Sequence, residues 1–277
     1  MVTIRRGFAD LPHGQMHYRT AGEGAADPIL AIHASPGSSR QLHGLIGDLS
    51  TEAKVIAPDT PGNGDSQPLF DGEPTIQQLA EAELRFMDAM QLDRVKLYGS
   101  HTGAAIAAEL ALMAPDRVSH VVLDGLEYLT GEAQADILAN YAEPFTPDQN
   151  GSYLIRLFQF CRDQYLFFPW YKRTRDARRD NGVAPAADLH AWVLEVMKGC
   201  ETYHLNYHAA FKWDGRETLA ALTVPTLVVA AENDPLFEKS AYMASFTKSQ
   251  QFAAMPRFDA PDFTAQRKTL IVDFFNS

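Results

Sequence analysis

Residues 97–104 read Leu-Tyr-Gly-Ser-His-Thr-Gly-Ala, and this stretch decides the fold. An apolar run ends here and a run of small, helix-compatible residues begins, which predicts a buried strand turning directly into a helix. Gly99 and Gly103 lie two residues on either side of His101. Such a sharp turn needs small residues at both glycine positions, because strand and helix crowd together there. It also forces the central residue into a strained backbone with an exposed side chain. We therefore expect His101 to project from the edge of a sheet.

Short apolar runs alternate with helical stretches along much of the chain. The runs are Pro28–His33, Lys54–Ala57, Val95–Tyr98, Val118–Leu123, Thr226–Ala231 and Gln251–Met255. Most lack polar alternation, which is typical of strands buried on both faces of a parallel sheet. Before them, Thr3–Phe8 and Gln15–Thr20 do alternate, and Gly14 predicts a turn between them, so we expect an antiparallel hairpin at one sheet edge. The pattern predicts an α/β fold with a doubly wound, mostly parallel sheet, and a helix after Thr75.

Residues 127–214 interrupt the alternation of strand-like runs and helical stretches. This segment has no strand-like run and is rich in aromatic residues. We expect a core formed by residues 1–126 and 215–277, with a helical cap over residues 127–214. The densest aromatic cluster in this cap includes Phe168, Trp170 and Tyr171. These side chains are predicted to form a substrate-binding wall, the alternative being that they only pack within the cap.

Two histidines of the cap, His204 and His208, lie four residues apart in a predicted helix, with Glu201 before them. Histidines at this spacing can ligate zinc, but the glutamate that directly follows the first histidine in such motifs is missing. We therefore expect no metal and predict that both histidines contact the substrate. One of them could supply a base, and the alternative is a polar surface of the cap.

The composition favours a protein that acts on small molecules. Among 277 residues, 24 are Lys or Arg and 35 are Asp or Glu, which gives a net charge of −11. Nucleic acids and anionic membranes both attract clustered positive charge, so neither is expected as a partner. No signal-peptide pattern and no membrane-spanning run is evident, which favours a cytoplasmic location. The chain also lacks the glycine motifs that bind dinucleotides or nucleoside triphosphates, so no cofactor is expected.

Three loop motifs, each directly after a predicted strand, carry a family resemblance. They are His33–Gly37 (His-Ala-Ser-Pro-Gly), Ala57–Ser66 (Ala-Pro-Asp-Thr-Pro-Gly-Asn-Gly-Asp-Ser) and the turn Gly99–Gly103. The set resembles the capped branch of the α/β-hydrolase fold family, which includes esterases, dehalogenases, epoxide hydrolases and carbon–carbon bond hydrolases. The resemblance implies that backbone N–H groups of Ser35 and Thr102 form an oxyanion hole. It also implies that Asp234 or, alternatively, Asp124 serves as the catalytic acid, while His33 braces its loop.

The sequence departs from this family at two positions. The central residue of the turn is a nucleophile in the family, usually serine, whereas here it is His101. The family also takes a histidine from the loop after the last strand, but no histidine follows His208. The usual Ser-His-Asp relay therefore cannot operate.

Three functional hypotheses follow. The favoured one is a hydrolase-like enzyme acting on a small, mostly apolar carbonyl or ester compound. In it, His101 serves as base or nucleophile, and Asp124 or Asp234 orients the ring. The second is a non-hydrolytic, cofactor-free enzyme of the lyase or dioxygenase type. The third is a catalytically inactive protein that binds a small molecule.

Overall fold

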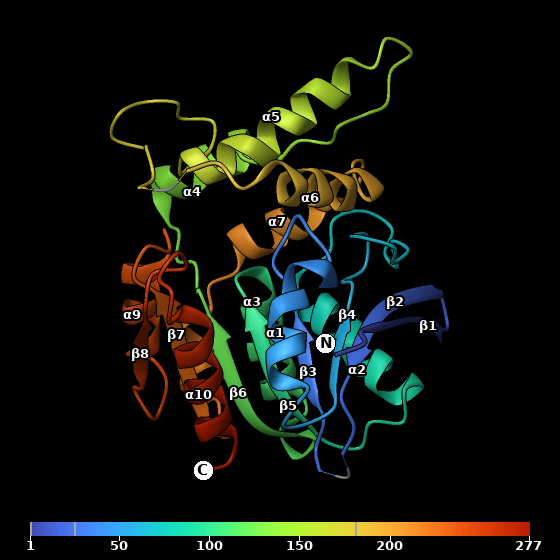
Figure 1. The fold of residues 1–277 in the computed structure, drawn as a ribbon, viewed down its shortest axis with the longest axis vertical. Coiled ribbons are helices and arrows are strands. Elements are labelled where there is room, and N and C mark those ends of the chain that lie inside the picture. The colour runs from blue at the N-terminus through green and yellow to red at the C-terminus, as the bar shows by residue number, and fades with distance from the viewer. Residues whose placement is uncertain (1, 25, 181) are drawn as a thin grey trace.

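A computed structural model describes residues 2–24, 26–180 and 182–277. Within these residues the strands form one eight-stranded sheet, in the order β1-β2-β4-β3-β5-β6-β7-β8 (Figure 1). The strands are β1 (Arg5–Leu11), β2 (Gly14–Ala21), β3 (Ile29–Ile32), β4 (Val55–Pro58), β5 (Val95–Ser100), β6 (Val118–Asp124), β7 (Thr226–Ala231) and β8 (Phe252–Met255). The β1–β2 and β2–β4 pairs are antiparallel, whereas the neighbours from β4 to β8 are parallel. The predicted α/β architecture and the edge hairpin are confirmed.

The hairpin turn lies slightly earlier than predicted. Pro12 and His13 form the turn, and Gly14 already pairs with Leu11 as the first residue of β2. The hairpin therefore turns through two residues, and Gly14 belongs to the strand that follows.

Helices cover both faces of the sheet. The helices are α1 (His43–Leu49), α2 (Ile76–Ala89), α3 (Thr102–Met113), α4 (Gly131–Asn140), α5 (Ser152–Leu166), α6 (Ala186–Lys198), α7 (Tyr203–Lys212), α8 (Arg216–Ala221), α9 (Phe237–Ala244) and α10 (Phe263–Phe275), with short 3₁₀ helices η1 (Ser39–Leu42) and η2 (Pro115–Arg117). Within the described residues, no helix is both long and apolar enough to cross a membrane.

Strand alternation explains the two cores. Leu30 and Ile32 of β3 pack with residues of α2, α3, α8 and α9, whereas Ile29 and Ala31 pack with α1 and α10. Successive side chains of a strand point to opposite faces, so a continuous apolar run serves both layers. At the start of α2, Thr75 and Gln78 form the reciprocal hydrogen bonds of a capping box, which confirms the predicted helix start.

Helices α4 to α7 lie together beyond one end of the sheet, above α3 and β6 (Figure 1). They have an aromatic core of their own, which includes Phe145, Phe160 and Tyr203. Polar contacts join them to the rest of the fold. Ser38 donates to Glu195 of α6 at 2.7 Å, and Lys198 donates to Asp65 at 2.7 Å. These helices therefore cover the edge at which the parallel strands end.

Candidate active site

His101 occupies a strained turn between β5 and α3, with φ 50° and ψ −110°. A non-glycine residue rarely adopts positive φ, and such outliers concentrate at functional sites. The flanking glycines are required by close packing. A Cβ atom on Gly99 would lie 2.2 Å from the Gly103 carbonyl oxygen, and one on Gly103 would lie 2.2 Å from the Ile32 carbonyl oxygen. The turn holds His101 at the carboxyl edge of the sheet, beneath the cap helices.

The His101 ring is held by an acid. Its Nε2 atom lies 2.9 Å from Oδ2 of Asp234, which follows β7. The other oxygen of Asp234, Oδ1, accepts a hydrogen bond from the Leu236 amide at 2.7 Å. The His101 side chain is 34% exposed, whereas Asp234 is 3% exposed. Asp234 is thus a buried, fixed carboxylate that determines which nitrogen of the imidazole faces inward.

The His101 ring has one edge packed against the chain and one edge, which carries Nδ1, towards the cavity. A Cβ atom on Gly125 would lie 2.6 Å from Cδ2 and 2.8 Å from Nε2 of His101, so this edge is packed against the chain. Nδ1 lies on the other side of the ring. His101 lines a cavity and is partly exposed, so the edge with Nδ1 is the one left open to the cavity.

The surrounding charges make His101 unusually basic. Burial alone would lower its pKa, but the charge and hydrogen bond of Asp234 outweigh burial, with further contributions from Asp124 and Glu127, and the pKa rises to about 9. Burial alone would raise the pKa of Asp234, but the charge and hydrogen bond of His101 outweigh burial, and the pKa of Asp234 is lowered. At neutral pH the two groups therefore form an imidazolium–carboxylate pair.

Asp124 does not hold the ring, which corrects the alternative pairing. Its Oδ2 atom accepts a hydrogen bond from the Tyr98 hydroxyl at 2.5 Å, while its backbone carbonyl accepts from the His101 amide at 2.8 Å. Burial and the nearby Asp234 raise the pKa of Asp124 to about 6, against the Tyr98 hydrogen bond. Between the two predicted acids, geometry assigns the His101 ring to Asp234.

Ser35 and Thr102 both line the same cavity as His101, at the ends of β3 and β5. Thr102 is the first residue of α3, where backbone N–H groups have no acceptor within the helix. The Ser35 loop is braced by His33, whose Nδ1 donates to the Ala34 carbonyl at 2.8 Å and whose Nε2 accepts from the Thr60 amide at 2.9 Å. This agrees with the structural role predicted for His33.

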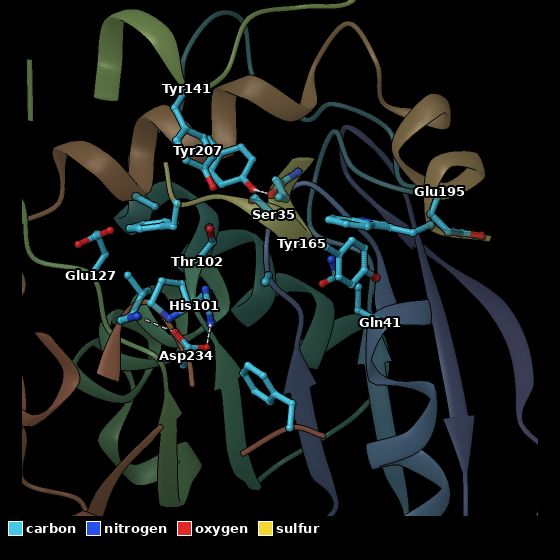
Figure 2. A pocket seen from close by; sticks show the side chains of 18 of the residues that line it. Ser35, Gln41, His101, Thr102, Glu127, Tyr141, Tyr165, Glu195, Tyr207 and Asp234 are labelled. Atoms are coloured by element: carbon cyan, nitrogen blue, oxygen red, sulfur yellow. Dashed lines mark hydrogen bonds and ion pairs between the residues drawn. The ribbon is translucent and has the colours of Figure 1, made fainter. Parts of the chain in front are cut away.

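A cavity of about 550 Å³ lies between the sheet edge and the cap helices. Figure 2 shows His101 between Asp234 and Thr102, with Tyr141 and Tyr207 on the cap side. Aromatic walls come from Phe168, Trp192, Phe211 and Trp213. Charged side chains also line the cavity, namely Arg40, Glu127, Arg179, Asp188 and Glu195. The cavity therefore combines a mostly apolar, aromatic lining with several charged groups.

Of the five predicted substrate-binding residues, only Phe168 lines this cavity. Trp170 instead donates its indole N–H to the Tyr141 carbonyl at 2.7 Å, and the Tyr171 hydroxyl donates to Asp136 at 2.8 Å. Both residues pack in the aromatic core of the cap. The prediction for Trp170 and Tyr171 is wrong because the apolar sequence cluster supports the cap itself.

His204 and His208 also lie away from the cavity. His208 bridges Glu73, whose carboxylate lies 2.5 Å from Nδ1, and the Ala142 carbonyl, 3.0 Å from Nε2. The His204 ring packs against His208 at 5.6 Å between centroids. These histidines tie α7 to neighbouring loops, which corrects their predicted contact with substrate. With both His208 nitrogens engaged, the pair does not present an open zinc site.

Another group with metal-ligand chemistry is formed by His17, Asp59 and Asp65. The Asp59 carboxylate already accepts from His17, the Ser39 amide and the Asp65 amide. Lys198 binds Asp65. The cluster braces the loop after β4, since its carboxylates are already satisfied by protein donors.

None of these five charged cavity residues was predicted from the sequence, and Glu127 and Arg179 show why. Glu127 follows β6 by three residues, so the rule that functional groups follow parallel strands could have located it. Arg179 comes from the loop between α5 and α6, where no comparable rule applies. Its Nη1 donates to the Gln164 carbonyl at 2.9 Å. Burial lowers the pKa of Arg179, although Asp234 opposes this shift.

The family model for the alpha/beta hydrolase fold matches residues 27–257. The chain belongs to the alpha/beta hydrolase fold family. An enol-lactonase from Burkholderia xenovorans LB400 has this fold with a TM-score of 0.77 and 19% identity, over 98% of this chain and 100% of that chain. In this alpha/beta hydrolase, the residue at the strained turn is a histidine paired directly with an aspartate.

Relatives with curated names include several hydrolases. A putative carbamate hydrolase from Azorhizobium caulinodans is 27% identical over 77% of this chain and 76% of its own length. A 2-hydroxy-6-oxononadienedioate/2-hydroxy-6-oxononatrienedioate hydrolase from Pseudomonas putida is 34% identical over 44% of this chain and 43% of its own length. The matches span less than half the length of the first curated relatives.

Proposed function

We propose that this alpha/beta hydrolase cleaves small ester or related carbonyl compounds by using His101 as its basic or nucleophilic group. The observation that carries the proposal is the His101–Asp234 pair in the strained turn, with Nδ1 on the cavity side. The hydrolase names of relatives support the reaction class. The cavity of about 550 Å³ suits a small organic substrate.

The reaction requires the neutral imidazole. With Nε2–H directed at Asp234, the neutral ring carries its lone pair on Nδ1. As a nucleophile, Nδ1 forms a bond to the carbonyl carbon and the bond to the alcohol oxygen breaks. The leaving alkoxide takes a proton from water, and the resulting hydroxide hydrolyses the acyl-imidazolium to the carboxylic acid and the free ring. As a base, Nδ1 takes a proton from the attacking water and returns it to the alkoxide when the bond to the alcohol oxygen breaks. Both routes place a positive charge on the ring, as an acyl-imidazolium or an imidazolium, and Asp234 stabilises it.

Negative charge develops on the carbonyl oxygen in either route. The proposed oxyanion hole consists of the backbone N–H groups of Ser35 and Thr102, whose residues line the cavity beside His101. One such donor typically contributes roughly 10²–10³ in turnover. The oxyanion hole thus provides stabilisation that does not depend on a serine nucleophile.

The test is hydrolysis of p-nitrophenyl butyrate by the wild type and by His101→Ala. His190→Ala is the matched control, since His190 is exposed on α6 and does not line the cavity. We expect His101→Ala to lose activity by roughly 10²-fold or more, and His190→Ala to keep it. Equal turnover in wild type and His101→Ala would overturn the proposal. Mass spectrometry of enzyme quenched with acid during turnover separates the routes, since only the nucleophilic route yields an acyl group on His101.

A further inference from the structure

Glu127 lies beside His101 but has no part in the hydrolysis proposed above. It lines the cavity, and its side chain is 13% exposed. Glu127 comes two residues after Gly125, and Gly125 packs against the His101 ring. Two residues span at most about 7 Å, so the Glu127 backbone starts close to the imidazole. Figure 2 shows Glu127 on the same side of the cavity as His101 and Thr102.

The two oxygens of Glu127 have different surroundings. Oε1 accepts from the Tyr128 amide at 2.9 Å and forms an ion pair with Lys239. Among the described residues, none donates a hydrogen bond to Oε2, and this oxygen is not among the fully buried unpartnered atoms. One oxygen is therefore anchored, while the other remains available to a molecule in the cavity.

Burial makes this carboxylate a suitable base. Burial raises the pKa of Glu127, although Lys239, the Tyr128 amide and His101 all oppose the shift. A carboxylate with a raised pKa accepts a proton more readily than an exposed one. His101, the neighbouring cation at neutral pH, is placed to stabilise negative charge on a bound carbonyl compound.

We infer that this site has a second activity, the exchange of protons on the carbon next to a ketone carbonyl, with Glu127 as the base. The carbon–hydrogen bond breaks and its proton passes to Oε2 of Glu127. The electron pair moves onto the carbonyl oxygen, where the N–H groups of Ser35 and Thr102 and the His101 imidazolium stabilise the enolate. Return of a solvent-exchanged proton restores the ketone. The inference rests on the oxyanion hole of the proposed function, but not on hydrolysis.

The test follows deuterium incorporation into the methyl group of acetophenone by proton NMR, in D₂O near neutral pD. This ketone has no leaving group, so the readout is independent of ester cleavage. We expect the wild type to exceed the buffer rate and Glu127→Gln to lose roughly 10²-fold or more of the enzyme-dependent exchange. Glu132→Gln is the control, since Glu132 is exposed on α4 and outside the cavity, and it should match the wild type.

A second variant guards against misfolding. Glu127→Asp keeps a charge for Lys239 but withdraws the carboxylate by one methylene, and it should lose at least about tenfold of the exchange. Wild-type exchange at the buffer rate, or unchanged exchange in Glu127→Gln or Glu127→Asp, would overturn the inference. So would a loss in His101→Ala with none in Glu127→Gln, since His101 would then be the base. Exchange without ester turnover would refute the proposed function alone, and ester turnover without exchange would refute this inference alone.

Discussion

The Nε2 atom of His101 lies 2.9 Å from Oδ2 of Asp234, although the two residues are 133 positions apart in the chain. They follow β5 and β7, which are separated in the sheet by β6. The carboxyl ends of parallel strands meet at one edge of a sheet, and here that edge brings the two side chains into direct contact. An imidazole at the strained turn therefore has its acid partner without an intervening histidine.

Replacing each of the two acids separately tests which one supports His101. We expect Asp234→Asn to lower kcat/KM for ester hydrolysis by roughly 10²-fold or more, because the imidazolium formed in the reaction loses its paired charge. Asp124→Asn should lower it by less than about fivefold, since an asparagine oxygen can still accept from Tyr98. The measurement is kcat/KM at pH 9 for both variants. A larger loss in Asp124→Asn would reverse the assignment.

Gly125→Ala tests the position of the imidazole. The new Cβ would lie 2.6 Å from Cδ2 of His101, and the residue has φ +79°. We expect a stability loss of about 1–3 kcal/mol, together with a fall in kcat/KM of roughly 10²-fold from the displaced ring. Urea denaturation and ester hydrolysis provide the two readouts.

Gly131→Ala is the matched control for that variant. Gly131 also has positive φ, 57°, but no atom lies within 4 Å of the Cβ position. It should lose stability through backbone strain and keep its activity. If both variants retained full activity, the contact between Gly125 and His101 would not govern catalysis.

The effect of Glu83→Gln on stability should depend on pH. Neither carboxylate oxygen of Glu83 has a hydrogen-bond partner among the described residues, and burial, aided by Asp59, raises its pKa to about 8. An ordinary glutamate in the unfolded chain ionises near 4.5, so wild-type stability falls as pH rises from there towards about 8. We expect Glu83→Gln to be more stable by up to about 3 kcal/mol at pH 7 and equally stable at pH 4.

Urea denaturation at the two pH values measures this difference. Glu81→Gln on the same helix is the control, because Glu81 is exposed and should show little change at either pH. A Glu83→Gln protein less stable than the wild type at pH 7 would show that the ionised carboxylate is tolerated in the core.

The sequence is most informative where the backbone leaves little choice. Gly99 and Gly103 predict the turn because any side chain there would collide with backbone atoms, and this places His101 at the sheet edge. The predicted strands likewise place Asp124 and Asp234 at the ends of neighbouring strands. The strand pattern does not show which acid contacts the His101 ring, because Asp124 is engaged by the Tyr98 hydroxyl, a side chain on another strand.

The cap is harder to predict for a physical reason. Aromatic side chains can form either a pocket wall or a hydrophobic core, so the composition around Trp170 and Tyr171 does not show which of these roles they have. Helix packing decides, and it turns these rings towards Tyr141. Likewise, the four-residue spacing of His204 and His208 shows that they share a helix face, but not that this face meets Glu73.

The most direct test of the His101–Asp234 account is the pH dependence of kcat/KM for phenyl acetate between pH 5.5 and 10. The pKa of His101 is raised to about 9, and hydrolysis needs the deprotonated ring. We therefore predict that kcat/KM rises with pH and is half-maximal near pH 9, and that in Asp234→Asn the half-maximal point moves towards the ordinary imidazole pKa of about 6.5. A wild-type profile that levels near pH 6.5, or falls between pH 7 and 9, would contradict the account.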